Sequence, residues 1–219
     1  MRGVAFIGGA GPAPEQCRDL VRGADLLVAA DSGLILAEQA GLRPDWIVGD
    51  MDSLDELLRL EAYSPDRIRR YPPDKDFTDT ELALQLLWEK GCDETWLIGG
   101  GGGRLDHLFA LRCLFEREPR PRRWFTAGED IHCLNEQEHL SQSLYPGALL
   151  SLFPLGEGPW ELQSQGLKWP LEGLPWDRGF FGLSNVLLDA AFSLFAEQGR
   201  FLVILPHAPI STSPARKIT

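Results

Sequence analysis

The chain has 219 residues, of which 44% are hydrophobic and 24% charged, a composition typical of a globular protein rather than a disordered one. Its formal net charge of −11 argues against a nonspecific nucleic-acid-binding surface. No apolar run approaches the roughly 20 residues that a membrane-spanning helix needs, and the N-terminus does not have the pattern of a signal peptide. We therefore expect a cytoplasmic protein that binds neither membranes nor nucleic acid.

The first half of the chain alternates strand and helix signals. Apolar runs end at glycine or aspartate and lead into helix-start patterns such as the capping box Thr78-Asp79-Thr80-Glu81. Repeated strand–helix units with short connections predict a mostly parallel sheet with helices on both faces. The predicted strands are 3–9, 25–30, 45–48, 67–71 and 95–98, and the predicted helices are 14–23, 33–40, one beginning at Ser53, one from Thr78 to about Gly91, and 105–115.

The second half has a different pattern. From about Ile131, short apolar runs are separated by glycine and proline, and such spacing predicts antiparallel strands in a sandwich or a barrel. The strand-length runs are 148–155, 160–163, 192–195 and 201–205. The predicted organisation is an α/β domain over residues 1–127, followed by an all-β domain over residues 128–219.

Acidic and glycine-rich segments follow the predicted strands of the first half. In an open parallel sheet, ligands bind beyond the carboxyl ends of the strands, so the side chains of these segments should lie close together. The turns Gly8-Gly9-Ala10-Gly11 and Gly99–Gly103 can offer backbone N–H groups to a phosphate. The carboxylates expected at this edge of the sheet are Asp50, Asp52, Asp74, Asp76, Asp79 and Asp106.

The charge of this region points to a metal-bound polyphosphate. Residues 44–81 include 11 acidic and 5 basic side chains, and carboxylates gathered so densely repel one another unless cations lie between them. Mg²⁺ is commonly held by one or two carboxylates together with substrate phosphates. The alternative is a solvated acidic surface, but three acidic loops that converge with two glycine-rich loops favour a functional site.

Several familiar site types are excluded. The sequence contains no P-loop, no dinucleotide-binding fingerprint after the first strand, no nucleophile elbow and no HExxH motif. Its four cysteines, at 17, 92, 113 and 133, do not have the spacing of a zinc site.

Six segments resemble, in order and spacing, the motifs of the thiamine pyrophosphokinase family. The resemblance implies transfer of pyrophosphate from ATP to the thiamine hydroxyl, with Mg²⁺, giving thiamine diphosphate and AMP. It also implies an α/β N-terminal domain, an all-β sandwich as the C-terminal domain, and a homodimer whose active sites lie between the subunits. The segments are Asp31-Ser32-Gly33, Gly49-Asp50-Met51-Asp52-Ser53, Asp74-Lys75-Asp76-Phe77-Thr78-Asp79, Gly102-Gly103-Arg104-Leu105-Asp106-His107, Gly166-Leu167-Lys168-Trp169-Pro170-Leu171 and Gly182-Leu183-Ser184-Asn185.

The resemblance also implies roles for individual residues. The expected catalytic residues are Asp50, Asp52, Asp76, Asp79 and Asp106, and the expected metal ligands are Asp50, Asp52, Asp74, Asp79 and Asp106. The expected contacts to ATP are Gly9, Asp31, Ser32, Asp74, Lys75, Thr78, Arg104 and His107. Ser184 and Asn185 fall in the thiamine motif. An aromatic face for the cationic thiazolium is expected from a residue nearby in sequence, which is Trp169, Trp176, Phe180 or Phe181. Either Asp79 or Asp106 is expected to accept the hydroxyl proton.

The sequence departs from the family pattern after Asn185. Val186 and Leu187 stand where many bacterial members have glutamate and an aromatic residue. Two alternatives therefore stay open: pyrophosphoryl transfer to another alcohol, such as a hydroxymethylpterin, and a nonenzymatic module that binds thiamine or a nucleotide. Because all the acidic motif residues are present, catalysis is the favoured interpretation.

Overall fold

The computed structural model describes residues 1–51 and 60–207. In the first half, strands and helices alternate as the sequence predicts. Asp52 and the start of the helix predicted from Ser53 lie outside the described residues. The elements of this half are β1 (Arg2–Phe6), α1 (Pro14–Leu20), β2 (Leu26–Ala30), α2 (Gly33–Gln39), β3 (Trp46–Gly49), a short 3₁₀ turn η1 (Pro65–Arg67), β4 (Ile68–Arg70), α4 (Asp79–Glu89), β5 (Glu94–Ile98), α5 (Leu105–Leu114) and β6 (Arg123–Phe125).

The strands of this half form a parallel sheet in the order β6-β5-β1-β2-β3-β4, with helices on both faces. Alternate residues of a strand point to opposite faces, so β1 contributes to two separate cores. Ala5 packs in the core formed with α4 and α5, whereas Val4 and Phe6 pack in the core formed with α1 and α2. The predicted α/β architecture is confirmed.

The second half is the predicted β-sandwich. One layer is the antiparallel set β11-β9-β13-β7, and the other is the sheet β10-β12-β8. Leu152 from the first layer and Leu162 and Leu194 from the second are buried in the core between them. The elements are β7 (Glu129–Leu134), β8 (His139–Ser143), β9 (Leu149–Leu155), β10 (Glu161–Gln165), β11 (Gly182–Val186), β12 (Ala191–Gln198) and β13 (Arg200–Pro206).

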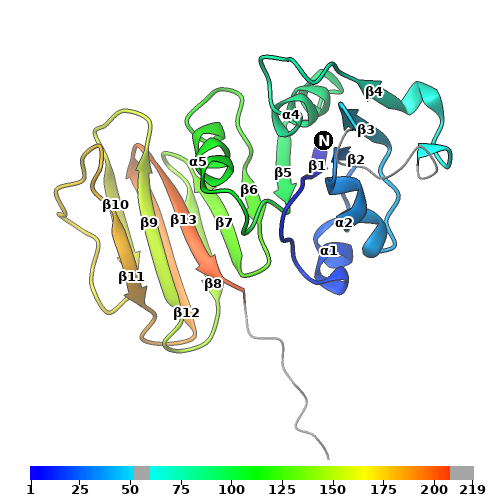
Figure 1. Cartoon of the computed structure of the whole chain (residues 1–219). Helices are drawn as coiled ribbons and strands as arrows, with labels where there is room; N and C mark the ends of the chain where they lie inside the picture. The colour runs from blue at the N-terminus through cyan, green and yellow to red at the C-terminus, as the bar shows by residue number, and fades with distance from the viewer. Residues whose placement is uncertain (52–59, 208–219) are drawn as a thin grey trace, which may run out of the picture.

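The two halves share one sheet. β7 pairs with β6, with Trp124 opposite Ile131, so within the described residues a ten-stranded sheet runs from β11 at one edge to β4 at the other (Figure 1). The boundary predicted between residues 127 and 128 falls in the turn between these two strands. Helix α5 spans the junction, since its Leu111 and Leu114 pack in one core with Ile131 of β7 and Leu202 of β13. None of the described helices has the length and apolar character needed to cross a membrane.

Candidate functional site

A cleft of about 520 Å³ opens at the carboxyl ends of β1, β2 and β5, between α4 and α5. This is the edge of the sheet where the sequence predicts ligand binding. The turns after β1 and β5 form its floor, and the first turn of α4 and one face of α5 form its walls. The predicted site residues that line it are Gly9, Asp31, Ser32, Lys75, Thr78, Asp79, Arg104 and His107.

The two glycine-rich turns bond to each other at the floor of the cleft. The Ala10 N–H donates to the Gly101 carbonyl at 2.7 Å, and the Gly101 N–H donates back to the Ala10 carbonyl at 2.9 Å. Gly99 has φ +114°, and a Cβ there would lie 2.2 Å from the Ile7 carbonyl oxygen, so only glycine fits. The amides of Ala10 and Gly101 therefore join the two turns rather than face a ligand.

An acidic cluster surrounds Lys75 at one side of the cleft. Its Nζ lies 2.8 Å from Asp50 Oδ2 and 3.2 Å from Asp79 Oδ1. Asp50 directly follows β3, whereas Asp79 is the first residue of α4. Asp31 lies beside them because Gly49 leaves room: a Cβ at Gly49 would lie 3.3 Å from both Asp31 Cβ and Asp79 Oδ1.

The charges in this cluster depend on one another. Burial raises the pKa of Asp79, the Lys75 ammonium opposes that rise, and Asp50 and Asp31 add to it, leaving the pKa above its ordinary value. Burial alone would lower the pKa of Lys75, but its contacts with Asp50 and Asp79 outweigh this effect, and its pKa is raised. Lys75 thus stays protonated and offsets the repulsion between the carboxylates around it.

The donor set fits a magnesium ion that arrives with phosphate. Oδ1 of Asp31 and Oδ1 of Asp79 are buried and make no hydrogen bond, although the latter is within ion-pair distance of Lys75. Carboxylate oxygens in this state are suited to a cation. Across residues 1–51 and 60–207, no three His, Cys, Asp or Glu side chains form a ready-made metal cage. One or two carboxylates completed by phosphate oxygens is the usual arrangement for Mg²⁺.

The other predicted carboxylates lie apart from this cluster. Asp106 pairs with Arg104, whose Nη2 lies 2.5 Å from Asp106 Oδ2, and this contact lowers the pKa of Asp106. Asp74 and Asp76 are exposed in the loop before α4 and do not line the cleft. Asp52 lies outside the described residues.

The capping box predicted at the start of α4 fixes the position of Asp79. The Thr78 hydroxyl accepts from the Glu81 N–H at 3.2 Å, and the Thr78 N–H donates to Glu81 Oε2 at 2.9 Å. Two of the N–H groups left unpaired at a helix start are thereby satisfied. Asp79 is held in the first turn, where the helix dipole favours a negative charge.

Sequence reasoning missed the α5 wall of the cleft. Ala110, Leu111, Leu114 and Arg117 line it, and Arg117 also forms an ion pair with Glu81, another lining residue. The signal was the helical spacing of His107, Ala110, Leu111 and Leu114, which places these four residues on one face of α5. Arg117 follows the end of the helix at Leu114. In the sequence, the same pattern is equally typical of a helix face packed in the core. Only the position of α5 against the sheet shows that this face lines a cleft.

The residues predicted to bind thiamine lie in the sandwich half. Asn185 is buried, and its side chain holds the backbone of Trp169: its Nδ2 donates to the Trp169 carbonyl at 2.6 Å, and its Oδ1 accepts from the Trp169 N–H at 3.2 Å. The Trp169 ring is about half exposed. Ser184 is exposed, and its N–H donates to Ser151 Oγ at 3.1 Å. In the described part of this one chain, the residues that line the cleft do not include Trp169, Ser184 or Asn185.

Comparisons with known proteins match this arrangement. The family profile "Thiamin pyrophosphokinase, catalytic domain" matches residues 17–120, and "Thiamin pyrophosphokinase, vitamin B1 binding domain" matches residues 132–194. A thiamine pyrophosphokinase of Bacillus subtilis (strain 168) is 30% identical over 159 residues, which cover 67% of this chain and 70% of that protein.

Solved structures show the same fold. The thiamin pyrophosphokinase structure from Geobacillus thermodenitrificans is 26% identical, with a TM-score of 0.72 over 95% of this chain and 99% of that chain. The structure from Candida albicans, at 18% identity, has a TM-score of 0.66 over 94% of this chain and 89% of that chain, a likeness of fold alone.

Proposed function

Because the chain belongs to the thiamine pyrophosphokinase family, we propose that it transfers pyrophosphate from ATP to the hydroxyl of thiamine, giving thiamine diphosphate and AMP. The observation that carries this proposal is the grouping of Asp50, Lys75 and Asp79 beside the glycine-rich turns. Pyrophosphoryl transfer requires that phosphate charge be neutralised and the reactants held in line. The cleft offers groups for both tasks.

The polyphosphate is proposed to lie between the glycine-rich turns and the first turn of α4. Arg104 and His107 line this part of the cleft and supply hydrogen-bond donors to phosphate oxygens. Asp50 and Asp79 would hold Mg²⁺ together with oxygens of the substrate. When bound, the ion would offset negative charge on the polyphosphate as the bond to the leaving group breaks.

The proton of the attacking hydroxyl has two candidate acceptors. Asp79 lines the cleft, whereas Asp106 is engaged by Arg104 in a two-point contact, with Arg104 Nε also 3.1 Å from Asp106 Oδ1. The acceptor must come within hydrogen-bond reach of the hydroxyl. We therefore propose Asp79 as the acceptor and assign Asp106 to the positioning of Arg104.

Thiamine is proposed to bind where two copies of the chain meet. Trp169 and Ser184 do not reach the cleft of their own chain, as described above, so the site would be incomplete in a monomer. Leu149, Phe181 and Leu183 of the sandwich are each close to half exposed or more, and the ring of Phe181 lies beside Phe153 of β9. A second copy that covers this apolar surface would bring its own cleft towards Trp169 and Ser184.

Product analysis tests the proposed reaction. The purified protein is incubated with ATP, Mg²⁺ and either thiamine or a hydroxymethylpterin, and the products are identified by mass spectrometry. We expect thiamine diphosphate and AMP in equal amounts, with no product from the pterin. Thiamine monophosphate with ADP, a pterin diphosphate, or unchanged thiamine would each contradict the proposal.

A further inference from the structure

The cleft continues past the acidic cluster along one face of α5. His107, Ala110, Leu111, Leu114 and Arg117 line it in that order. At 1.5 Å per residue, the stretch from His107 to Leu114 is about 10 Å long. The wall is therefore polar at the end near the glycine-rich turns, apolar along its middle and charged at its far end.

The apolar part of this wall is firmly supported. Leu111 and Leu114 are each 7% exposed and are packed in the core shared by both halves of the molecule. Leu111 also lies against the glycine-rich turn after β5, because a Cβ at Gly100 would lie 2.7 Å from Leu111 Cδ1. Ala110 is exposed on the same face, so a small side chain leaves the space in front of the leucines open.

Arg117 closes the far end of the wall. Its guanidinium pairs with Glu81, and Glu81 is in turn bonded to the Thr78 hydroxyl at 2.9 Å. The Arg117 side chain is 56% exposed, whereas that of Glu81 is 14% exposed. The guanidinium is thus held from one side by a nearly buried carboxylate and keeps a planar surface towards solvent.

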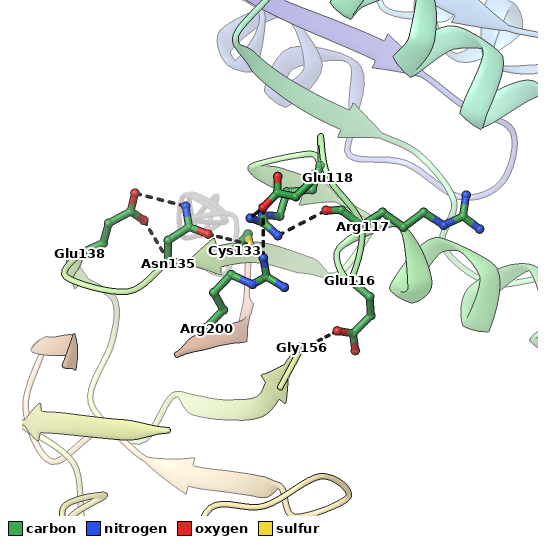
Figure 2. Close-up of polar contacts among 9 residues, drawn as sticks. Glu116, Arg117, Glu118, Cys133, Asn135, Glu138, Gly156 and Arg200 are labelled. Atoms are coloured by element: carbon green, nitrogen blue, oxygen red, sulfur yellow. Dashed lines mark hydrogen bonds and ion pairs between the residues drawn. The ribbon is translucent and has the colours of Figure 1, made fainter. Parts of the chain in front are cut away.

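The residues on either side of Arg117 anchor its backbone to the sandwich half. The Gly156 N–H donates to Glu116 Oε2 at 2.5 Å, and Arg200 Nη1 lies 3.3 Å from Glu118 Oε1. Figure 2 shows Glu116 and Glu118 directed towards these partners while the Arg117 side chain extends away from them. Arg117 therefore reaches the cleft from a backbone segment fixed at both neighbours.

We propose that the apolar wall of α5, closed by Arg117, binds the planar base of the nucleoside triphosphate substrate. A flat aromatic ring fits against Ala110, Leu111 and Leu114, and a guanidinium stacks favourably on such a ring. The distance along α5 leaves room for the ribose between the base and phosphates bound at the glycine-rich turns. This inference rests on the proposed function in one respect, that ATP is the phosphate donor.

Binding measurements test the base site separately from catalysis. Isothermal titration in the presence of Mg²⁺ compares ATP with inorganic tripolyphosphate, which has the phosphates but no base. The variants are Ala110→Trp, which fills the space before the leucines, and Arg117→Gln, which removes the guanidinium. Asp19→Trp on α1, an exposed position on the opposite face of the sheet, is the matched control.

We expect Ala110→Trp to weaken ATP binding about tenfold or more, because the larger side chain occupies the space of the base. Arg117→Gln should weaken it about threefold to tenfold, because the stacking contact of the guanidinium is lost. Tripolyphosphate binding should be unchanged in both, and the control should change neither. An equal loss of affinity for both ligands, or an unchanged affinity for ATP, would overturn the proposed base site. Circular dichroism and thermal melting check that each variant is folded. If ATP binding responds as expected but no thiamine diphosphate forms, the base site stands and the proposed reaction fails.

Discussion

At the scale of single residues, the sandwich half contains two different kinds of candidate thiamine residue. Trp169 presents a half-exposed ring, whereas Asn185 is buried and uses its amide to hold the Trp169 backbone. Asn185 therefore acts through Trp169, as a positioning residue. The sequence predicts that both belong to one site. Their different roles could not be predicted, because the hydrogen bond between them joins residues that are 16 positions apart in the sequence.

Substitutions should separate these two roles. Trp169→Ala is expected to raise the KM for thiamine by about tenfold, with the KM for ATP and the melting temperature unchanged, because only a surface contact to a cation is lost. Asn185→Ala should raise the same KM and also lower stability by about 1–3 kcal/mol, since it leaves the Trp169 N–H and carbonyl without their partner. Steady-state kinetics and urea unfolding measure both effects. Equal rises in KM for thiamine and ATP would remove these residues from the thiamine site.

At the scale of elements, sequence patterns predicted the strands correctly where an apolar strand leads directly into a helix. β1, β2, β3 and β5 were predicted for this reason, as was the capping box of α4. β6 was missed because it is only three residues long and follows a run of arginine and proline that is typical of a linker. The continuity of the sheet across residues 127 and 128 could not be predicted, since strand pairing is set by contacts between the halves.

The packing of α2 against β1 requires glycine at position 33. A Cβ there would lie 2.1 Å from the Phe6 carbonyl oxygen, which is backbone and cannot rotate away. Gly33→Ala should destabilise the protein by about 1–3 kcal/mol or more through overpacking. Gly128→Ala is the matched control, because a Cβ at that position meets nothing within 4 Å, and its effect should stay within about 0.5 kcal/mol. Equal urea midpoints for the two variants would show that α2 does not pack this closely.

The β6–β7 hairpin should make stability depend on pH through Asp130. Burial alone would raise the pKa of Asp130, but His132 and Arg123 outweigh it, and the pKa lies below its ordinary value. The pair between Arg123 Nη2 and Asp130 Oδ2 spans 2.6 Å. A carboxylate with a lowered pKa stabilises the fold fully above its unfolded-state pKa, and this stabilisation is lost as the pH falls through the lowered value.

Asp130→Asn should therefore lose stability at neutral pH and show a smaller further loss between neutral and acidic pH than the wild type. Urea unfolding at a series of pH values measures this difference. Asp19→Asn, at an exposed ion pair on α1, should keep the wild-type pH dependence. If Asp130→Asn kept the wild-type pH dependence too, the stabilising role of this carboxylate would be refuted.

At the scale of the whole molecule, the cleft and the predicted thiamine residues belong to different halves of the chain. The acidic cluster was predictable because parallel strands bring their carboxyl ends to one edge. The sharing of a site between two chains is implied by the family resemblance alone, and no periodicity or spacing within the sequence encodes it. The exposed apolar residues of β9 and β11 give this proposal its physical support.

Mixing two variants with lesions in different halves tests the shared site. The assay uses thiamine well below the wild-type KM, where Trp169→Ala should keep only about a tenth of the wild-type rate. A twofold dimer of an Asp79→Asn chain and a Trp169→Ala chain carries both lesions in one site and leaves the other site intact. Random exchange makes about half of the dimers mixed, so activity should recover to about a quarter of the wild-type value. Native mass spectrometry confirms the exchange. Demonstrated exchange without recovery would mean that each site is formed within one chain.

The cleft around Asp50, Lys75 and Asp79 is the proposed place of pyrophosphate transfer. The most direct test is the rate of thiamine-dependent AMP release by Asp79→Asn, compared with the wild type at saturating ATP, thiamine and Mg²⁺. We predict a loss of about 100-fold or more in kcat with the fold unchanged, since the variant removes a charge and a proton acceptor at the reacting groups. Turnover within a few-fold of the wild type would contradict the account.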